Sequence, residues 1–223
     1  RQLSAFAGTP LFTGGIVFTP PPPFVEGSSA DAAILYGPTD VAVGPDGNVY
    51  VVSRTRAAIY VISPDRRATT LPDRGSIRLS DPSSLALSPD GTLYVTEPHA
   101  HQVLKREGDG WVRVAGVGQA GADPDGQPAT ASRLNNPDDL AFDEFGDLYI
   151  TDWGNNRVRV VDPDGTMTTV AGREVAGLDD DTPREAGRAI LRLAGTTSAG
   201  LAMYSDGTLY VSDVQNRRIR YVR

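Results

Sequence analysis

The sequence predicts an all-β fold, a β-propeller of four blades with four antiparallel strands each. A hairpin unit occurs four times, and its turn glycines lie 44, 55 and 61 residues apart. Repeats of this length that each encode one small sheet are typical of propellers. The chain has no cysteine and no run of about 18 apolar residues, so we expect no disulfide and no membrane-spanning helix. The turn glycines are Gly47, Gly91, Gly146 and Gly207.

Each unit begins with a short strand in which apolar residues flank an alanine, as Val41 and Val43 flank Ala42. A tight turn follows at the glycine, which accepts a positive φ, and a second strand comes next. A polar loop then leads to a third strand. Blades two and three add a fourth strand. We expect first-strand alanines near the axis, where inner strands crowd: Ala42, Ala86, Ala141 and Ala202.

We expect a single domain over residues 1–223. Blade one spans about 34–72, blade two about 79–116, blade three about 134–172, and blade four about 193–223 plus 1–8. The segment Gln2–Ala7 is similar to the fourth strands, so we expect it to pair with the C-terminal strand Arg217–Val222. That pairing would close the ring, remove exposed sheet edges and favour a monomer. A four-blade segment of a larger ring, cut at the same point within a blade, would show the same sequence pattern at its two ends.

The net charge is −7 and the isoelectric point about 4.8, which argue against broad contact with a phosphate backbone. We therefore expect no nucleic-acid partner and no membrane insertion. We expect a protein or peptide partner instead, because such partners suit the binding surface of a propeller.

Nearly the whole chain resembles bacterial NHL-repeat proteins, most strongly in blade three and the linker before it. The motifs are Val114–Gly121, Asp125–Pro137 and Asp147–Arg159. Blades one and two depart from the motif after the second strand. The resemblance implies a propeller, usually of six blades, that binds proteins, peptides or RNA, and it favours an extracytoplasmic bacterial protein.

In this strand order, the loops between second and third strands and the linkers between blades emerge on one face. Loops on a rigid scaffold commonly carry function, so we expect a binding face there. Its predicted residues are Arg54, Arg56, Glu97, His99, His101, Asp152, Trp153, Asn155, Asn156, Asp213, Gln215 and Asn216. Trp153 fits a binding hot spot or packing over its own blade equally well. Asp152 and Asp213 fit a structural role better, because carboxylates accept loop N–H groups.

Catalysis is the alternative, as a metal-dependent hydrolase or lyase with its site at the channel mouth. The starts of the first strands meet there and place Asp40 and Asp139 on opposed blades. These two carboxylates are weak candidates for a channel cation. The only histidines, His99 and His101, share one loop and would need a third ligand such as Glu97. We therefore expect no cofactor.

Two linkers have unusual compositions. Thr19–Phe24 is a polyproline stretch that either docks on a partner or stiffens the linker. Asp179–Asp181 is an acidic run without the alternating spacing of a calcium loop.

Overall fold

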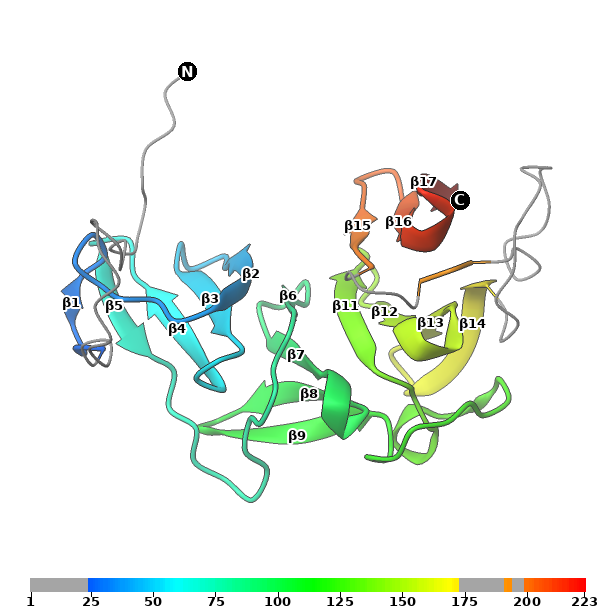
Figure 1. Cartoon of the computed structure of the whole chain (residues 1–223), viewed down its shortest axis with the longest axis horizontal. Coiled ribbons are helices and arrows are strands. Elements are labelled where there is room, and N and C mark those ends of the chain that lie inside the picture. The colour runs from blue at the N-terminus through cyan, green and yellow to red at the C-terminus, as the bar shows by residue number, and fades with distance from the viewer. Residues whose placement is uncertain (1–23, 173–190, 194–198) are drawn as a thin grey trace, which may run out of the picture.

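The chain forms four antiparallel sheets that confirm an all-β, four-bladed propeller (Figure 1). The computed structural model describes residues 24–172, 191–193 and 199–223. Blade one contains β2 (Pro38–Val43), β3 (Val49–Ser53), β4 (Ala58–Ile62), β5 (Arg67–Thr70) and the short edge strand β1 (Ser28–Ser29). Blade two contains β6 (Leu85–Leu87), β7 (Leu93–Glu97), β8 (Gln102–Glu107) and β9 (Gly110–Ala115).

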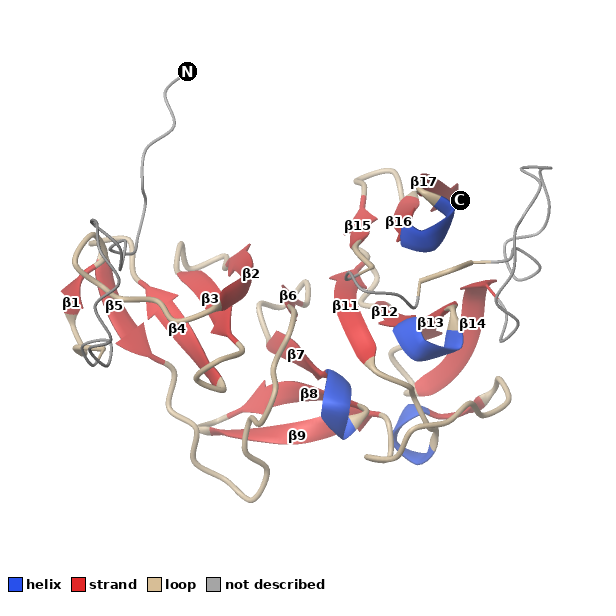
Figure 2. Ribbon diagram, in the orientation of Figure 1, coloured by secondary structure: helices blue, strands red, loops and turns tan. Residues whose placement is uncertain are grey.

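Blade three contains β11 (Pro137–Phe142), β12 (Leu148–Asp152), β13 (Arg157–Val161), β14 (Thr166–Gly172) and the edge strand β10 (Gln127–Pro128). Blade four has three strands among the described residues: β15 (Leu201–Met203), β16 (Leu209–Asp213) and β17 (Arg218–Val222). Short 3-10 turns follow the second strands of the last three blades, and another precedes β11 (Figure 2). They are Pro98–Ala100, Trp153–Asn155, Val214–Asn216 and Ala129–Ala131. No described helix is long and apolar enough to cross a membrane.

The predicted hairpin turns form as the sequence indicates. Gly47 and Gly91 adopt φ values of +78° and +84°, which a β-carbon would disfavour. At the first of these turns, the Asp46 carboxylate accepts the Asn48 N–H at 3.0 Å, so the side chain supports the turn.

The hydrophobic core is divided among the spaces between blades. We call the sheet face toward the preceding blade the leading face, and the face toward the following blade the trailing face. Val52 and Ile59 on the trailing face of blade one pack with Leu85 and Val95 on the leading face of blade two. Equivalent clusters join blades two and three and blades three and four. Burial between sheets therefore fixes the order of the blades.

The inner strands β2, β6, β11 and β15 follow one another around the centre, and the sheets form an arc (Figure 1). Blades one and four lie at its two ends. The strand predicted to close the ring, residues 1–8, lies outside the described residues, so closure stays a prediction. The acidic run Asp179–Asp181 and most of the polyproline stretch also lie outside them.

Candidate ligand-binding face

The loops after the second strands lie at the same end of the blades as the starts of the first strands. The register of the sheets shows this directly, because Pro38 pairs with Ser53 and Pro137 pairs with Asp152. The linkers between blades reach the first strands at this end. We call this end of the molecule the loop face.

The last residue of each second strand is a buried polar residue that binds a linker. Ser53, Glu97, Asp152 and Asp213 are all fully buried. Glu97 accepts the N–H of Ser80 at 3.0 Å, Asp152 that of Asn135 at 2.7 Å, and Asp213 that of Arg192 at 2.8 Å. The Ser53 hydroxyl donates to the carbonyl of Tyr36. These side chains hold the linkers to the loop face and satisfy buried backbone groups.

Asp152 also organises its own loop. It accepts hydrogen bonds from the Asn155 amide at 2.8 Å and from the buried Arg157 guanidinium at 3.2 Å. Burial raises the pKa of Asp152, and the bonds from Asn155 and Asn135 oppose that rise. Asp213 has the corresponding role in blade four, where it binds Asn216 at 2.9 Å and Arg220 at 2.6 Å.

Most of the remaining predicted residues of blades three and four form hydrogen bonds with linkers or pack between the blades. Asn155 donates to the Gly121 carbonyl at 2.8 Å, and Asn156 accepts the Leu193 N–H at 2.9 Å. Trp153 is half-buried and packs against the apolar cluster between blades three and four. Gln215 has an exposed side chain on the loop face, while its N–H donates to the Arg192 carbonyl.

In blades one and two, two of the predicted residues contact the same carboxylate. Arg54 and His99 both bind Asp81, Arg54 with two nitrogens at 2.7 and 2.8 Å and His99 Nδ1 at 2.5 Å. Burial acts to raise the pKa of Asp81, but the bonds and charge of Arg54 dominate and lower it. Sequence reasoning did not single out Asp81.

Arg56 and His101 bind elsewhere on this face. The Arg56 guanidinium lies 4.2 Å from the centre of the Tyr36 ring. His101 Nδ1 accepts the Asn136 N–H at 3.1 Å, so its ring is neutral, and burial lowers its pKa. The two histidines therefore have different partners.

A pocket of about 260 Å³ opens where the first strands begin. It brings together the side chains that the sequence places at the channel mouth. Ser84 lies between the two predicted carboxylates, 2.6 Å from Asp40 Oδ2 and 2.5 Å from Asp139 Oδ1. The pocket is lined by Thr39, Asp40, Arg54, Ser83, Ser84, Asp138, Asp139, Ala199 and Gly200.

The two axial carboxylates also tie neighbouring blades together. Asp40 accepts the Leu85 N–H of blade two at 2.9 Å, and Asp139 accepts the Leu201 N–H of blade four at 2.7 Å. Burial raises the pKa of Asp139. Every oxygen of both groups accepts a hydrogen bond, which leaves little capacity for a cation. Among the described residues, no three His, Asp or Glu side chains are grouped to hold a metal ion.

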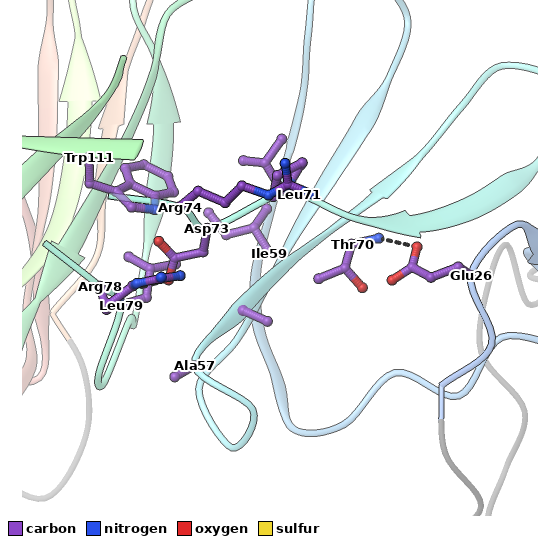
Figure 3. Close-up of a pocket in the computed structure, with 12 residues that line it drawn as sticks. Glu26, Ala57, Ile59, Thr70, Leu71, Asp73, Arg74, Arg78, Leu79 and Trp111 are labelled. Atoms are coloured by element: carbon purple, nitrogen blue, oxygen red, sulfur yellow. Dashed lines mark hydrogen bonds between the residues drawn. The ribbon is translucent and has the colours of Figure 1, made fainter. Parts of the chain in front are cut away.

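A larger pocket, of about 500 Å³, lies between blades one and two (Figure 3). The linker that joins these blades forms much of its wall. Ala57, Ile59, Leu71 and Leu79 make it apolar, and polar groups surround them. The polar residues are Glu26, Thr70, Asp73, Arg74 and Arg78, together with Trp111 from β9.

Two residues that line this pocket each carry a buried polar atom with no hydrogen-bond partner among the described residues: Trp111 Nε1 and Asp73 Oδ1. Trp111 is only 4% exposed. The other oxygen of Asp73 accepts the Leu79 N–H at 3.2 Å, which fixes the carboxylate. Sequence reasoning missed this pocket because it followed the loops, whereas Trp111 lies on a fourth strand. The sequence feature that could have indicated the pocket is the pair of arginines, Arg74 and Arg78, in the linker between blades one and two.

A family model described as "SMP-30/Gluconolactonase/LRE-like region" matches residues 26–173. Teneurin-m of Drosophila melanogaster is 29% identical over 156 residues, which cover 63% of this chain and 6% of that protein.

Two solved structures share the fold. An auxiliary nutrient binding protein from Bacteroides ovatus has a TM-score of 0.66 at 24% identity, over 86% of this chain and 49% of that one. A virginiamycin B lyase from Staphylococcus aureus has a TM-score of 0.55 at 18% identity, over 83% and 52%. The chain thus spans about half the length of these structures, and the likeness shows the fold alone.

Proposed function

The chain belongs to the SMP-30/gluconolactonase/LRE-like family of β-propellers, and from that premise we propose that it is a non-enzymatic binding protein. Its ligand would be a small molecule that carries an anionic group and a hydroxyl group. The ligand would occupy the pocket between blades one and two. The observation that carries the proposal is the pair of unpartnered buried atoms in this pocket, Trp111 Nε1 and Asp73 Oδ1.

Buried polar groups in folded proteins nearly always have a hydrogen-bond partner, so we expect each of these two atoms to have one. The indole N–H is a donor only, and an ionised carboxylate is an acceptor only. A hydroxyl-bearing ligand supplies both complements. Arg74 and Arg78 are exposed at the same pocket, and guanidinium groups bind carboxylate or phosphate in a bidentate manner. The pocket volume is in the range of small-molecule sites.

The nutrient-binding relative from Bacteroides ovatus supports a binding role, and it does not specify the ligand. We also propose a protein or peptide partner, on the loop face. The exposed Gln215 and the half-buried Trp153 lie on the loop face. The finer assignment to NHL repeats also stays a prediction that rests on the motifs of blade three.

Isothermal titration calorimetry tests the pocket with gluconate, citrate, glucose 6-phosphate and neutral glucose. We expect an anionic, hydroxylated probe to bind and glucose to bind at least tenfold more weakly. Trp111→Phe removes the N–H but keeps an aromatic ring, and Arg78→Gln removes a charge; each should weaken binding about tenfold. Arg113→Gln is the matched control, because Arg113 lies on β9 but does not line the pocket. Binding that survives both pocket variants would refute the assignment.

A metal-dependent hydrolase or lyase at the channel mouth is the second proposal. It is favoured by one observation, the sharing of the Ser84 hydroxyl by Asp40 and Asp139. A hydroxyl has one proton, so it donates to only one of these carboxylates at a time. A proton on Asp139, or a cation, would relieve the repulsion between the Ser84 oxygen and the carboxylate to which it does not donate. Addition of calcium or zinc should then raise the melting temperature, and Asp139→Asn should abolish that rise. An unchanged melting temperature would exclude this proposal.

A further inference from the structure

One arginine in blade two occupies a position that is aliphatic in the other three blades. Arg106 follows the residue that pairs with the second-strand tyrosine of its sheet. The equivalent residues of the other sheets are Ile62, Val161 and Val222. Ile62 and Val161 are 1% and 7% exposed, and Val222 is half-buried. The Arg106 side chain is 13% exposed, so a mostly buried cation lies where the repeat otherwise places an apolar side chain.

The Arg106 guanidinium has no carboxylate within hydrogen-bonding distance among the described residues. Its Nη2 lies 3.6 Å from Oδ1 of the exposed Asp109, which is too far for a hydrogen bond. Its Nη1 is buried and has no hydrogen-bond partner in the described part of the chain. The guanidinium carbon lies 5.2 Å from the centre of the Trp111 ring, a cation–π contact that orients the side chain. Burial lowers the pKa of Arg106, and the charges of Asp109 and Asp73 oppose that change.

This guanidinium lines a second pocket between blades one and two, of about 210 Å³. The pocket lies at the end of the blades opposite the loop face, because Gly91 and Thr92 of the hairpin turn between β6 and β7 belong to its wall. Both turn residues are half-buried, so the pocket reaches the surface. It is distinct from the larger pocket between these blades, although Leu71 lines both. Its remaining lining residues are Tyr50, Leu93 and Arg106.

Two carboxylates bind residues that line this pocket. Asp46 accepts the Tyr50 hydroxyl at 3.2 Å. Asp90 accepts the Thr92 N–H at 3.1 Å. Both carboxylates are exposed, so water and salt screen their charges. The charge of the mostly buried Arg106 is screened much less, so we expect it to dominate the potential inside the pocket.

We propose that this pocket binds a small oxyanion, a phosphate or a carboxylate, through the Arg106 guanidinium. A buried charge without a partner is costly, and an anion in the pocket would compensate it. The planar guanidinium presents parallel N–H donors that match the paired oxygens of carboxylate and phosphate. The pocket is smaller than the sites of about 300–1,000 Å³ that hold drug-sized ligands, which favours a small anion. This site and the one proposed above differ in their residues and their ligands, so either can fail without the other.

Thermal unfolding of the whole chain tests the site with phosphate and, separately, with acetate, each compared with chloride at equal ionic strength. Binding should raise the melting temperature by roughly 5–9 °C at about fifty times Kd. Arg106→Leu restores the residue type of the other blades, so it should abolish the rise and leave the anion-free melting temperature unchanged or higher. Arg106→Gln, which keeps a polar side chain, should abolish the rise as well.

Arg113→Leu is the matched control, since Arg113 is exposed on β9 and lines neither pocket. It removes the same charge and should keep the full rise, including any general effect of phosphate on stability.

Three results would overturn the inference. In the first, neither anion raises the melting temperature of the parent chain. In the second, Arg106→Leu and Arg106→Gln keep the rise; if Arg78→Gln loses it, the anion occupies the larger pocket, and the proposal made for that pocket is supported instead. In the third, Arg106→Leu melts at a lower temperature without any anion effect in the parent, which would make Arg106 a structural residue whose charge is compensated within the chain.

Discussion

Asp152 was a candidate for the binding face, and the structure makes it a structural residue whose removal should destabilise the protein. Its carboxylate accepts three hydrogen bonds, from Asn135, Asn155 and Arg157, at 2.7, 2.8 and 3.2 Å. Asp152→Ala leaves the buried Arg157 guanidinium without this carboxylate and removes the acceptor of a linker N–H. Breaking a buried pair on one side costs about 3–5 kcal/mol.

A loss of that size is a large part of the free energy of unfolding, which is about 5–15 kcal/mol for a typical protein. Urea denaturation followed by circular dichroism measures it directly. We expect the midpoint to fall with an unchanged slope, and the melting temperature to fall by roughly 10 °C. Asp152→Asn keeps the side-chain size and should cost less, about 1–3 kcal/mol.

Asp164→Ala is the control, because Asp164 is exposed in the turn before β14 and should change stability by less than about 0.5 kcal/mol. If Asp152→Ala costs less than about 1 kcal/mol, the reasoning is wrong. The carboxylate would then not hold the linker in place, and Asp152 would again be a candidate ligand-binding residue.

Two further predictions concern titratable groups. Ser84→Ala should destabilise the protein by about 1–3 kcal/mol, since it removes the hydroxyl between Asp40 and Asp139. Burial raises the pKa of Asp139 and the Ser84 hydroxyl lowers it, so the variant should raise this pKa further. A carboxyl with a raised folded-state pKa loses stability as pH rises above its unfolded value, so the deficit should be larger at pH 7 than at pH 4. Equal deficits in urea melts at both values would contradict this. Burial, with the nearby charges of Asp143 and Asp147, raises the pKa of Tyr149 to about 12. Ultraviolet titration should therefore show a tyrosine that ionises near pH 12, absent in Tyr149→Phe and shifted downward in Asp143→Asn; an unchanged curve in both variants would exclude the assignment.

The hairpin repeat was readable from the sequence because its causes are local. Alternating apolar residues and a glycine with positive φ specify two strands and a turn without reference to the rest of the chain. The same repeat aligned the ends of the second strands, and so placed Glu97, Asp152 and Asp213 at equivalent points. It also placed Asp40 and Asp139 together at the channel mouth, but it did not indicate the hydroxyl shared between the two carboxylates.

Periodicity along the chain thus determined the blades, their number and the loop face. Tertiary structure decided how each blade sits against the next, because that depends on linkers of different lengths and on side chains more than forty residues apart. The pocket with Trp111 and Asp73 exists only where two sheets and a linker meet.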